Sequence, residues 1–187
     1  MKSKVKSILI LKNNEKRKSR NHRRAAHTRR QRGYHWEDTI VKRFNSADNW
    51  KAFRLGSPST GLPDVLAVNT QESTIFTIEA KSGTTNLLPV PDDQIERCLK
   101  WVNTFDIYQK RKVLLAFKFL SKKRTGLGTY EKRELREFFK IWDPSLGISS
   151  CSCTYDGKIF GQINGKRTQI ELQDCIMPFK IKFHNSD

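Results

Sequence analysis

The residues best suited to chemistry are two acids and a lysine: Asp64, which follows Pro63, and Glu79 and Lys81, which stand two positions apart. Side chains two positions apart on a β-strand share a face, so Glu79 and Lys81 should converge while Ala80 packs behind them. Asp64, at the start of a neighbouring strand, can bring a second carboxylate to the same point. Two carboxylates form a hard oxygen site suited to Mg²⁺, with positions left for water and a phosphate oxygen. A lysine there can orient or help deprotonate the water, so the set predicts metal-assisted phosphodiester hydrolysis.

Each of these motifs is weak when taken alone. Pro-Asp is common in turns, and Glu-x-Lys is common on solvated strand faces. The joint placement across a predicted hairpin strengthens the interpretation, because Arg54 and Ser57 lie beside a loop and Glu37 lies on a predicted opening helix.

Hydrophobic periodicity predicts the elements that hold these residues. Trp36, Ile40, Phe44 and Ala47 recur at spacings of three and four, which indicates an amphipathic helix from Tyr34. Strands are predicted over Trp50 to Leu55, Val65 to Val68, Thr74 to Ile78 and Val113 to Phe119. The first three should form a meander.

A second helix should begin after Pro91, with Asp92 and Asp93 in its positive first turn, and continue to Phe105. The order helix, three strands, helix, strand favours a mixed α/β fold, with the later strand free to lie parallel to a central one.

The chain changes character after Leu120. Residues 121–136 are charged and broken by glycine, Phe138 to Trp142 suits an edge strand, and hairpin turns are indicated at Asp156-Gly157 and Asn164-Gly165. We therefore expect three parts: a disordered basic arm over 1–32, a core over 33–120 and a β-rich C-terminal extension over 121–187.

Charge is concentrated at the N-terminus. The chain has a formal net charge of +17, and residues 1–32 hold thirteen basic residues against the single acid Glu15. Such an excess points to a polyanionic partner, and the arm would add salt-dependent phosphate contacts. The alternative is a solvated, dispensable tail.

Other classes are disfavoured. No stretch approaches the roughly 18 apolar residues of a spanning helix, and Ile8 to Leu11 is too short for a signal-peptide core, so a cytoplasmic protein is expected. Four cysteines are present: Cys98, Cys151, Cys153 and Cys175. Reduced thiols are favoured over two alternatives. One is a zinc site formed by Cys151, Cys153 and Cys175, with His184 as a fourth ligand, and the other is a disulfide from Cys175 to Cys151 or Cys153.

The order of these motifs resembles that of the archaeal Holliday-junction resolvase family of PD-(D/E)xK nucleases. The motifs are Gly33-x-x-x-Glu37, Arg54, the loop residues Ser57 and Ser59, Pro63-Asp64 and Glu79-Ala80-Lys81. The resemblance covers roughly Arg32 to Phe119. It implies a restriction-endonuclease-like core, in which a central mixed β-sheet is flanked by helices.

The resemblance also implies roles for individual residues. Asp64 and Glu79 would ligate Mg²⁺, with Mn²⁺ as an alternative, together with the Ala80 carbonyl, while Lys81 would handle the nucleophilic water. Glu37 would support the metal or its waters. DNA contacts would come from Arg54, from Ser57 or Ser59, and from Gln94.

The implied activity is that of a homodimer whose paired sites cut a four-way DNA junction symmetrically, in association with the nucleoid. Recognition would depend on shape and phosphates and not on base edges. Three alternatives stay open: a related nuclease acting on flap, mismatched or linear DNA, a non-catalytic nucleic-acid-binding protein, and a ribosome-associated protein.

Overall fold

The structure is a computed structural model that describes residues 28, 31–56, 61–126 and 128–181. The predicted basic arm lies outside the described residues, apart from Thr28, Gln31 and Arg32, which are helical. The loop serines Ser57 and Ser59 also lie outside them.

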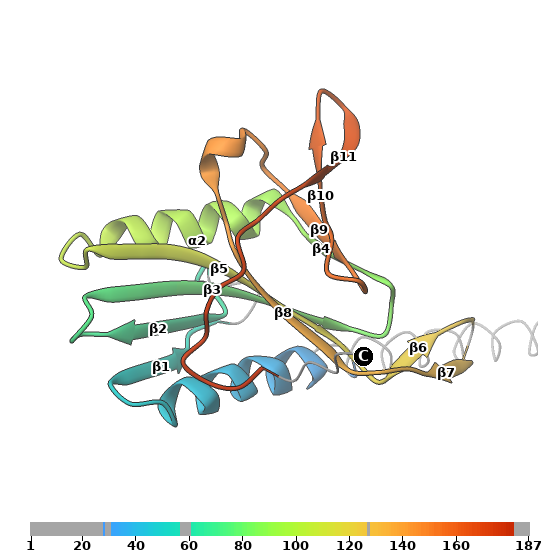
Figure 1. The fold of residues 1–187 in the computed structure, drawn as a ribbon, viewed down its shortest axis with the longest axis horizontal. Helices are drawn as coiled ribbons and strands as arrows, with labels where there is room; N and C mark the ends of the chain where they lie inside the picture. The colour runs from blue at the N-terminus through green and yellow to red at the C-terminus, as the bar shows by residue number, and fades with distance from the viewer. Residues whose placement is uncertain (1–27, 29–30, 57–60, 127, 182–187) are drawn as a thin grey trace, which may run out of the picture.

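A five-stranded sheet forms the centre of the fold (Figure 1). Its strands, in spatial order, are β1 (Trp50–Arg54), β2 (Val65–Asn69), β3 (Thr74–Gly83), β5 (Lys110–Phe119) and β8 (Arg136–Ile141). β3 and β5 are parallel, and the other neighbours are antiparallel. The predicted meander, the parallel later strand and the edge strand near Phe138 are therefore confirmed, although β8 extends the sheet beyond residue 120.

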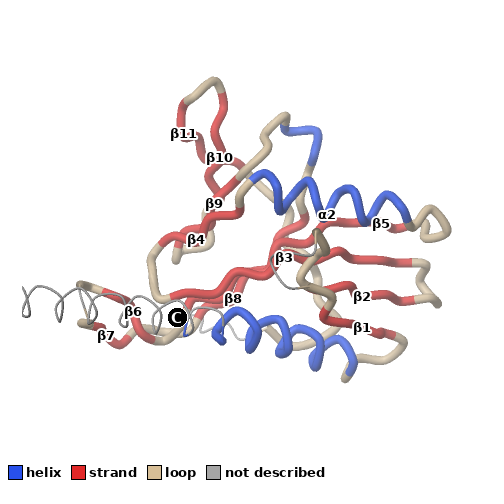
Figure 2. Tube along the Cα trace, turned by 180° about the vertical axis from the view of Figure 1, so that it is seen from behind, coloured by secondary structure: helices blue, strands red, loops and turns tan. Residues whose placement is uncertain are grey.

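Two helices cover opposite faces of this sheet (Figure 2). An opening helix, residues 31–45, buries Trp36, Ile40 and Phe44 against one face. On the other face, α2 (Asp92–Thr104) buries Ile95, Cys98 and Val102. β3 and β5 are covered on both faces, so their sequences are continuous apolar runs and do not alternate between apolar and polar residues. The predicted mixed α/β architecture is confirmed.

The C-terminal part builds a second, four-stranded antiparallel sheet. Its strands, in spatial order, are β11 (Lys166–Ile170), β10 (Ile159–Ile163), β9 (Cys151–Thr154) and β4 (Leu87–Val90). The turns that join β9 to β10 and β10 to β11 contain Gly157 and Gly165, whose φ angles are 82° and 72°. The two predicted hairpins are present, and the β-rich extension is confirmed.

Smaller features complete the fold. β6 (Lys122–Arg124) and β7 (Tyr130–Lys132) form a separate hairpin, and a short 3-10 helix spans Pro144–Leu146. The four cysteines are buried and free. None of the helices described is long and apolar enough to span a membrane.

Candidate active site

The C-terminal half of β3 carries the central pair of the site. The Glu79 side chain is 1% exposed, and its Oε1 lies 2.5 Å from Lys81 Nζ. The two residues share a strand face, as their spacing predicts, and that face is turned toward α2, where Thr77 donates to the Cys98 carbonyl.

Strand register brings Asp64 to the same point. Val65 pairs with Ile78, so Asp64 lies one position beyond the ladder and beside Glu79. Its Oδ2 accepts a hydrogen bond of 2.8 Å from the Ala80 backbone N–H. Burial, and next the charge of Glu79, raise the pKa of Asp64 to about 6, although the Ala80 hydrogen bond opposes this.

Glu37 approaches from the opening helix and is 7% exposed. Its Oε2 is buried without a hydrogen-bond partner. Burial, followed by the charge of Asp64, raises its pKa to about 7, and Arg54 opposes the shift. Gly33 lies beside this carboxylate, and a Cβ there would be at ordinary van der Waals distance, 3.6 Å, from Glu37 Oε1.

Arg97 of α2 belongs to the site and is not predicted from the sequence. Its Nη2 lies 2.9 Å from Glu79 Oε2, and its side chain is 11% exposed. The lysine and the arginine thus hold one oxygen each of the Glu79 carboxylate. The available signal is that Arg97 and Gln94 stand three positions apart beside the buried stripe of α2, on one helix face.

The predicted DNA-contacting residues differ in position. Gln94 has a buried Oε1 without a partner and shares its helix face with Arg97. Arg54 is more exposed, lies 3.5 Å from Asp38 and stacks over the Tyr34 ring at 5.0 Å. Asp38 follows Glu37, so Arg54 lies at the rim of the site.

The oxygen donors gathered here are of the type that hard divalent cations prefer. Three carboxylates, those of Glu37, Asp64 and Glu79, are electrostatically coupled, and they face the two cations Lys81 and Arg97. One Glu37 oxygen is buried without a hydrogen-bond partner, and the pKa values of Glu37 and Asp64 are raised first by burial and then by the neighbouring carboxylates. Within the described ranges, no group of three His, Cys, Asp or Glu residues is arranged to hold a metal ion as it stands. Lys81 and Arg97 each contact the Glu79 carboxylate.

Fold and motif order together define the class, a PD-(D/E)xK nuclease core. The sequence model of the archaeal Holliday junction resolvase (Hjc) family matches residues 28–141, which include β8, so the chain belongs to this family. Among solved structures, Archaeoglobus fulgidus Hjc, a Holliday junction resolvase from an archaeal hyperthermophile, is similar at 20% identity and a TM-score of 0.39. That match covers 56% of this chain and 72% of the other. No curated protein matches.

Proposed function

We propose that this protein is a structure-selective DNA endonuclease that resolves four-way junctions by metal-dependent phosphodiester hydrolysis, with paired symmetric cuts. The observation that carries the proposal is the convergence of Asp64, Glu79 and Lys81 where β2 begins and β3 approaches its end, in a chain of the Holliday junction resolvase family. It would act in the cytoplasm, on the nucleoid.

The metal would be Mg²⁺, with Mn²⁺ as an alternative. Asp64, Glu79 and the Ala80 carbonyl would hold it, and Glu37 would support it or its waters. Bound there, the ion supplies an activated water and charge stabilisation on the phosphate.

Side chains of the protein would position the reactants and stabilise charge. Lys81 carries a cationic Nζ beside Glu79, where it would orient the attacking water and offset charge developing on the phosphate. Arg97 would act as a positioning residue, because its contact with Glu79 Oε2 would fix the orientation of that carboxylate. DNA contacts would come from Arg54 at the rim and from Gln94 on α2. Ser57 or Ser59 would add a further contact to the DNA strand.

Paired cuts require two sites, so we propose a homodimer. The two-fold symmetry of the enzyme would then match that of the junction.

The test compares cleavage of a four-way junction, a flap and a linear duplex in Mg²⁺, using wild type and Glu79→Gln. We expect symmetric paired cuts in the junction by wild type, and loss of cleavage with retained DNA affinity in the variant. Preference for flap or linear DNA would overturn the junction assignment and favour a related nuclease. Binding without cleavage of any substrate would overturn the enzymatic proposal.

A further inference from the structure

The β6–β7 hairpin consists of largely exposed, mostly charged residues that contribute little to the stability of the fold. None of its six strand residues is buried. Two-stranded hairpins without an apolar face are marginally stable by themselves. Lys122 also lies directly opposite Lys132, and like charges in that arrangement are destabilising.

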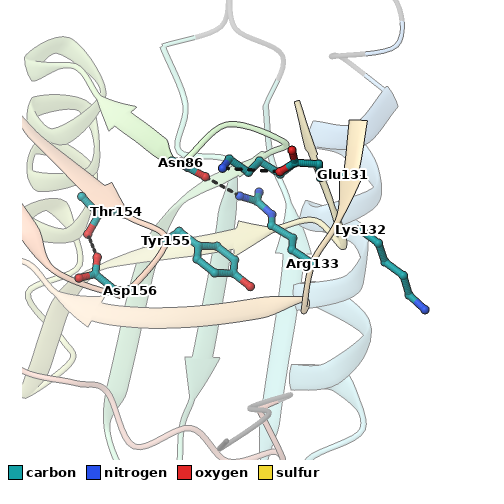
Figure 3. A pocket seen from close by; sticks show the side chains of 8 residues that line it. Asn86, Glu131, Lys132, Arg133, Thr154, Tyr155 and Asp156 are labelled. Atoms are coloured by element: carbon teal, nitrogen blue, oxygen red, sulfur yellow. Dashed lines mark hydrogen bonds and ion pairs between the residues drawn. The ribbon is translucent and has the colours of Figure 1, made fainter. Parts of the chain in front are cut away.

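Register separates the hairpin into two unlike faces. Lys123 pairs with Glu131 across the strands, and their side chains lie 3.8 Å apart beside a depression of about 530 Å³. The opposite face carries Lys122, Arg124, Lys132 and the half-exposed ring of Tyr130. Among the described residues of the hairpin, no acid lies on that face. Lys132 borders the depression, but in Figure 3 its amino group points away from the other labelled side chains.

Arg133 fixes the hairpin to the body of the protein. Its guanidinium donates to the carbonyls of Leu120, Thr85 and Gly83 at 2.8 to 3.4 Å. It also donates to Asn86 Oδ1 at 3.0 Å (Figure 3). Every guanidinium nitrogen of Arg133 is therefore used in holding the hairpin to the body of the protein.

Aromatic rings and a backbone bond reinforce the anchor. The Arg133 guanidinium lies 4.5 Å from the Tyr155 ring centre and 5.6 Å from that of Phe119. Arg124 N donates to the Thr84 carbonyl at 2.9 Å. A hairpin of low intrinsic stability is thus held in one orientation.

That orientation places the basic face near the candidate active site. Thr84 follows β3 and lies three residues beyond Lys81, about 10 Å at the rise of a strand. The opening helix begins at the same end of the sheet, since Ser82 Oγ donates to the Arg32 carbonyl. Figure 1 shows the hairpin extending from this end of the sheet.

We propose that the face formed by Lys122, Arg124, Tyr130 and Lys132 binds the phosphate backbone of the DNA arm that leaves the active site. This inference rests on the proposed function. A polyanion removes the repulsion between Lys122 and Lys132, and an anchored hairpin binds it without a large ordering cost.

The experiment compares two double variants that each remove two positive charges. Lys122→Ala/Lys132→Ala alters the hairpin, and Lys166→Ala/Arg167→Ala alters the exposed strand β11, which lies away from the site in Figure 1. Both are made in the Glu79→Gln background, and the dissociation constant for junction DNA is measured against salt concentration. We expect the hairpin pair to weaken binding about tenfold and to lower the salt slope by about 2, with a smaller change in the control.

Equal effects of the two pairs would overturn the proposal, because net charge alone would then explain the loss. Thermal unfolding checks the fold, and the hairpin pair should unfold no earlier than its parent. Cleavage by the same pairs with Glu79 intact separates this inference from the proposed function. If wild type cuts no junction but the hairpin pair still weakens DNA binding more than the control, the enzymatic proposal fails and the hairpin inference stands. If wild type cuts junctions and the hairpin pair binds DNA as the control does, the hairpin inference alone fails.

Discussion

Two buried glutamates, Glu79 and Glu137, are held by the same kinds of partner. Glu79 contacts Lys81 at 2.5 Å and Arg97 at 2.9 Å. Glu137, whose side chain is fully buried, contacts Arg43 at 2.6 and 3.1 Å and Lys118 at 3.5 Å. Among the contacts described, each carboxylate is thus paired with one arginine and one lysine.

The difference lies in what surrounds them. Glu79 has two further acids beside it, Glu37 and Asp64, whose pKa values are raised by burial and by mutual repulsion. Glu137 joins three elements: Arg43 from the opening helix, Lys118 from β5 and its own strand β8. We infer that a buried ion cluster is structural where cations satisfy the acid, and is suited to bind a further cation where acids outnumber the cations.

The largest effect is expected from a substitution of Glu79, the glutamate with two further acids beside it. Glu79→Gln should reduce junction cleavage by about 10³-fold or more, because a neutral amide is a poorer metal ligand, and this corresponds to about 4 kcal/mol in the barrier. Single-turnover cleavage in Mg²⁺ measures the loss. Cleavage within tenfold of wild type would show that Glu79 is not essential to the chemistry.

Changing Glu137 should affect stability and not chemistry. Glu137→Gln keeps the volume but removes the buried carboxylate charge that Arg43 and Lys118 contact, so the free energy of unfolding should fall by about 3 kcal/mol or more. Urea unfolding measures the change. Cleavage per folded molecule should stay near wild type at low temperature, and a loss as deep as that of Glu79→Gln would contradict a purely structural role.

Local patterns explain why much of the fold could be predicted. The apolar runs of β3 and β5 and the glycines of the C-terminal hairpins act through their immediate neighbours. β4 was missed because Leu87–Val90 contains Pro89 and pairs with β9, more than sixty residues away. Proline is tolerated there because β4 is an edge strand.

The residues of the candidate active site also differ in whether local sequence predicts them. Glu37, Asp64, Glu79 and Lys81 are recognisable from residue type and spacing. Arg97 was not recognised, because its contact with Glu79 depends on how α2 packs across β3. Arg43 and Glu137 stand 94 residues apart, and no periodicity signals their pairing. Roles in metal binding remain predictions for every member of the set.

A divalent cation should distinguish the two clusters directly. If the acids around Glu79 bind Mg²⁺, saturating Mg²⁺ should stabilise the folded protein by about 1–3 kcal/mol. Calorimetric unfolding with Mg²⁺ and with chelator gives the shift in Tm. The shift should vanish in Asp64→Asn and persist in Glu137→Gln, and a shift retained in Asp64→Asn would place the cation elsewhere.

The smallest effect concerns pH. Glu37 has a folded-state pKa of about 7 against an ordinary value of 4.5, so in the absence of metal the folded protein holds a proton that the unfolded chain releases. The stability associated with this proton is present below pH 4.5 and is lost as the pH rises to about 7. Glu37→Gln removes the titration, so its Tm should exceed that of wild type by about 3 °C at pH 8, or roughly 1 kcal/mol, with a smaller difference at pH 4.

Thermal unfolding of both proteins from pH 4 to pH 8 in chelator provides the measurement. Asp64→Asn should behave similarly over a lower window, between about pH 3.8 and 6. A Glu37→Gln variant less stable than wild type at pH 8 would mean that Glu37 is as well satisfied as Glu137. Because chelator removes any bound metal, a gain at pH 8 would identify Glu37 as an acid that costs the folded state stability, as expected of a group retained for binding a cation.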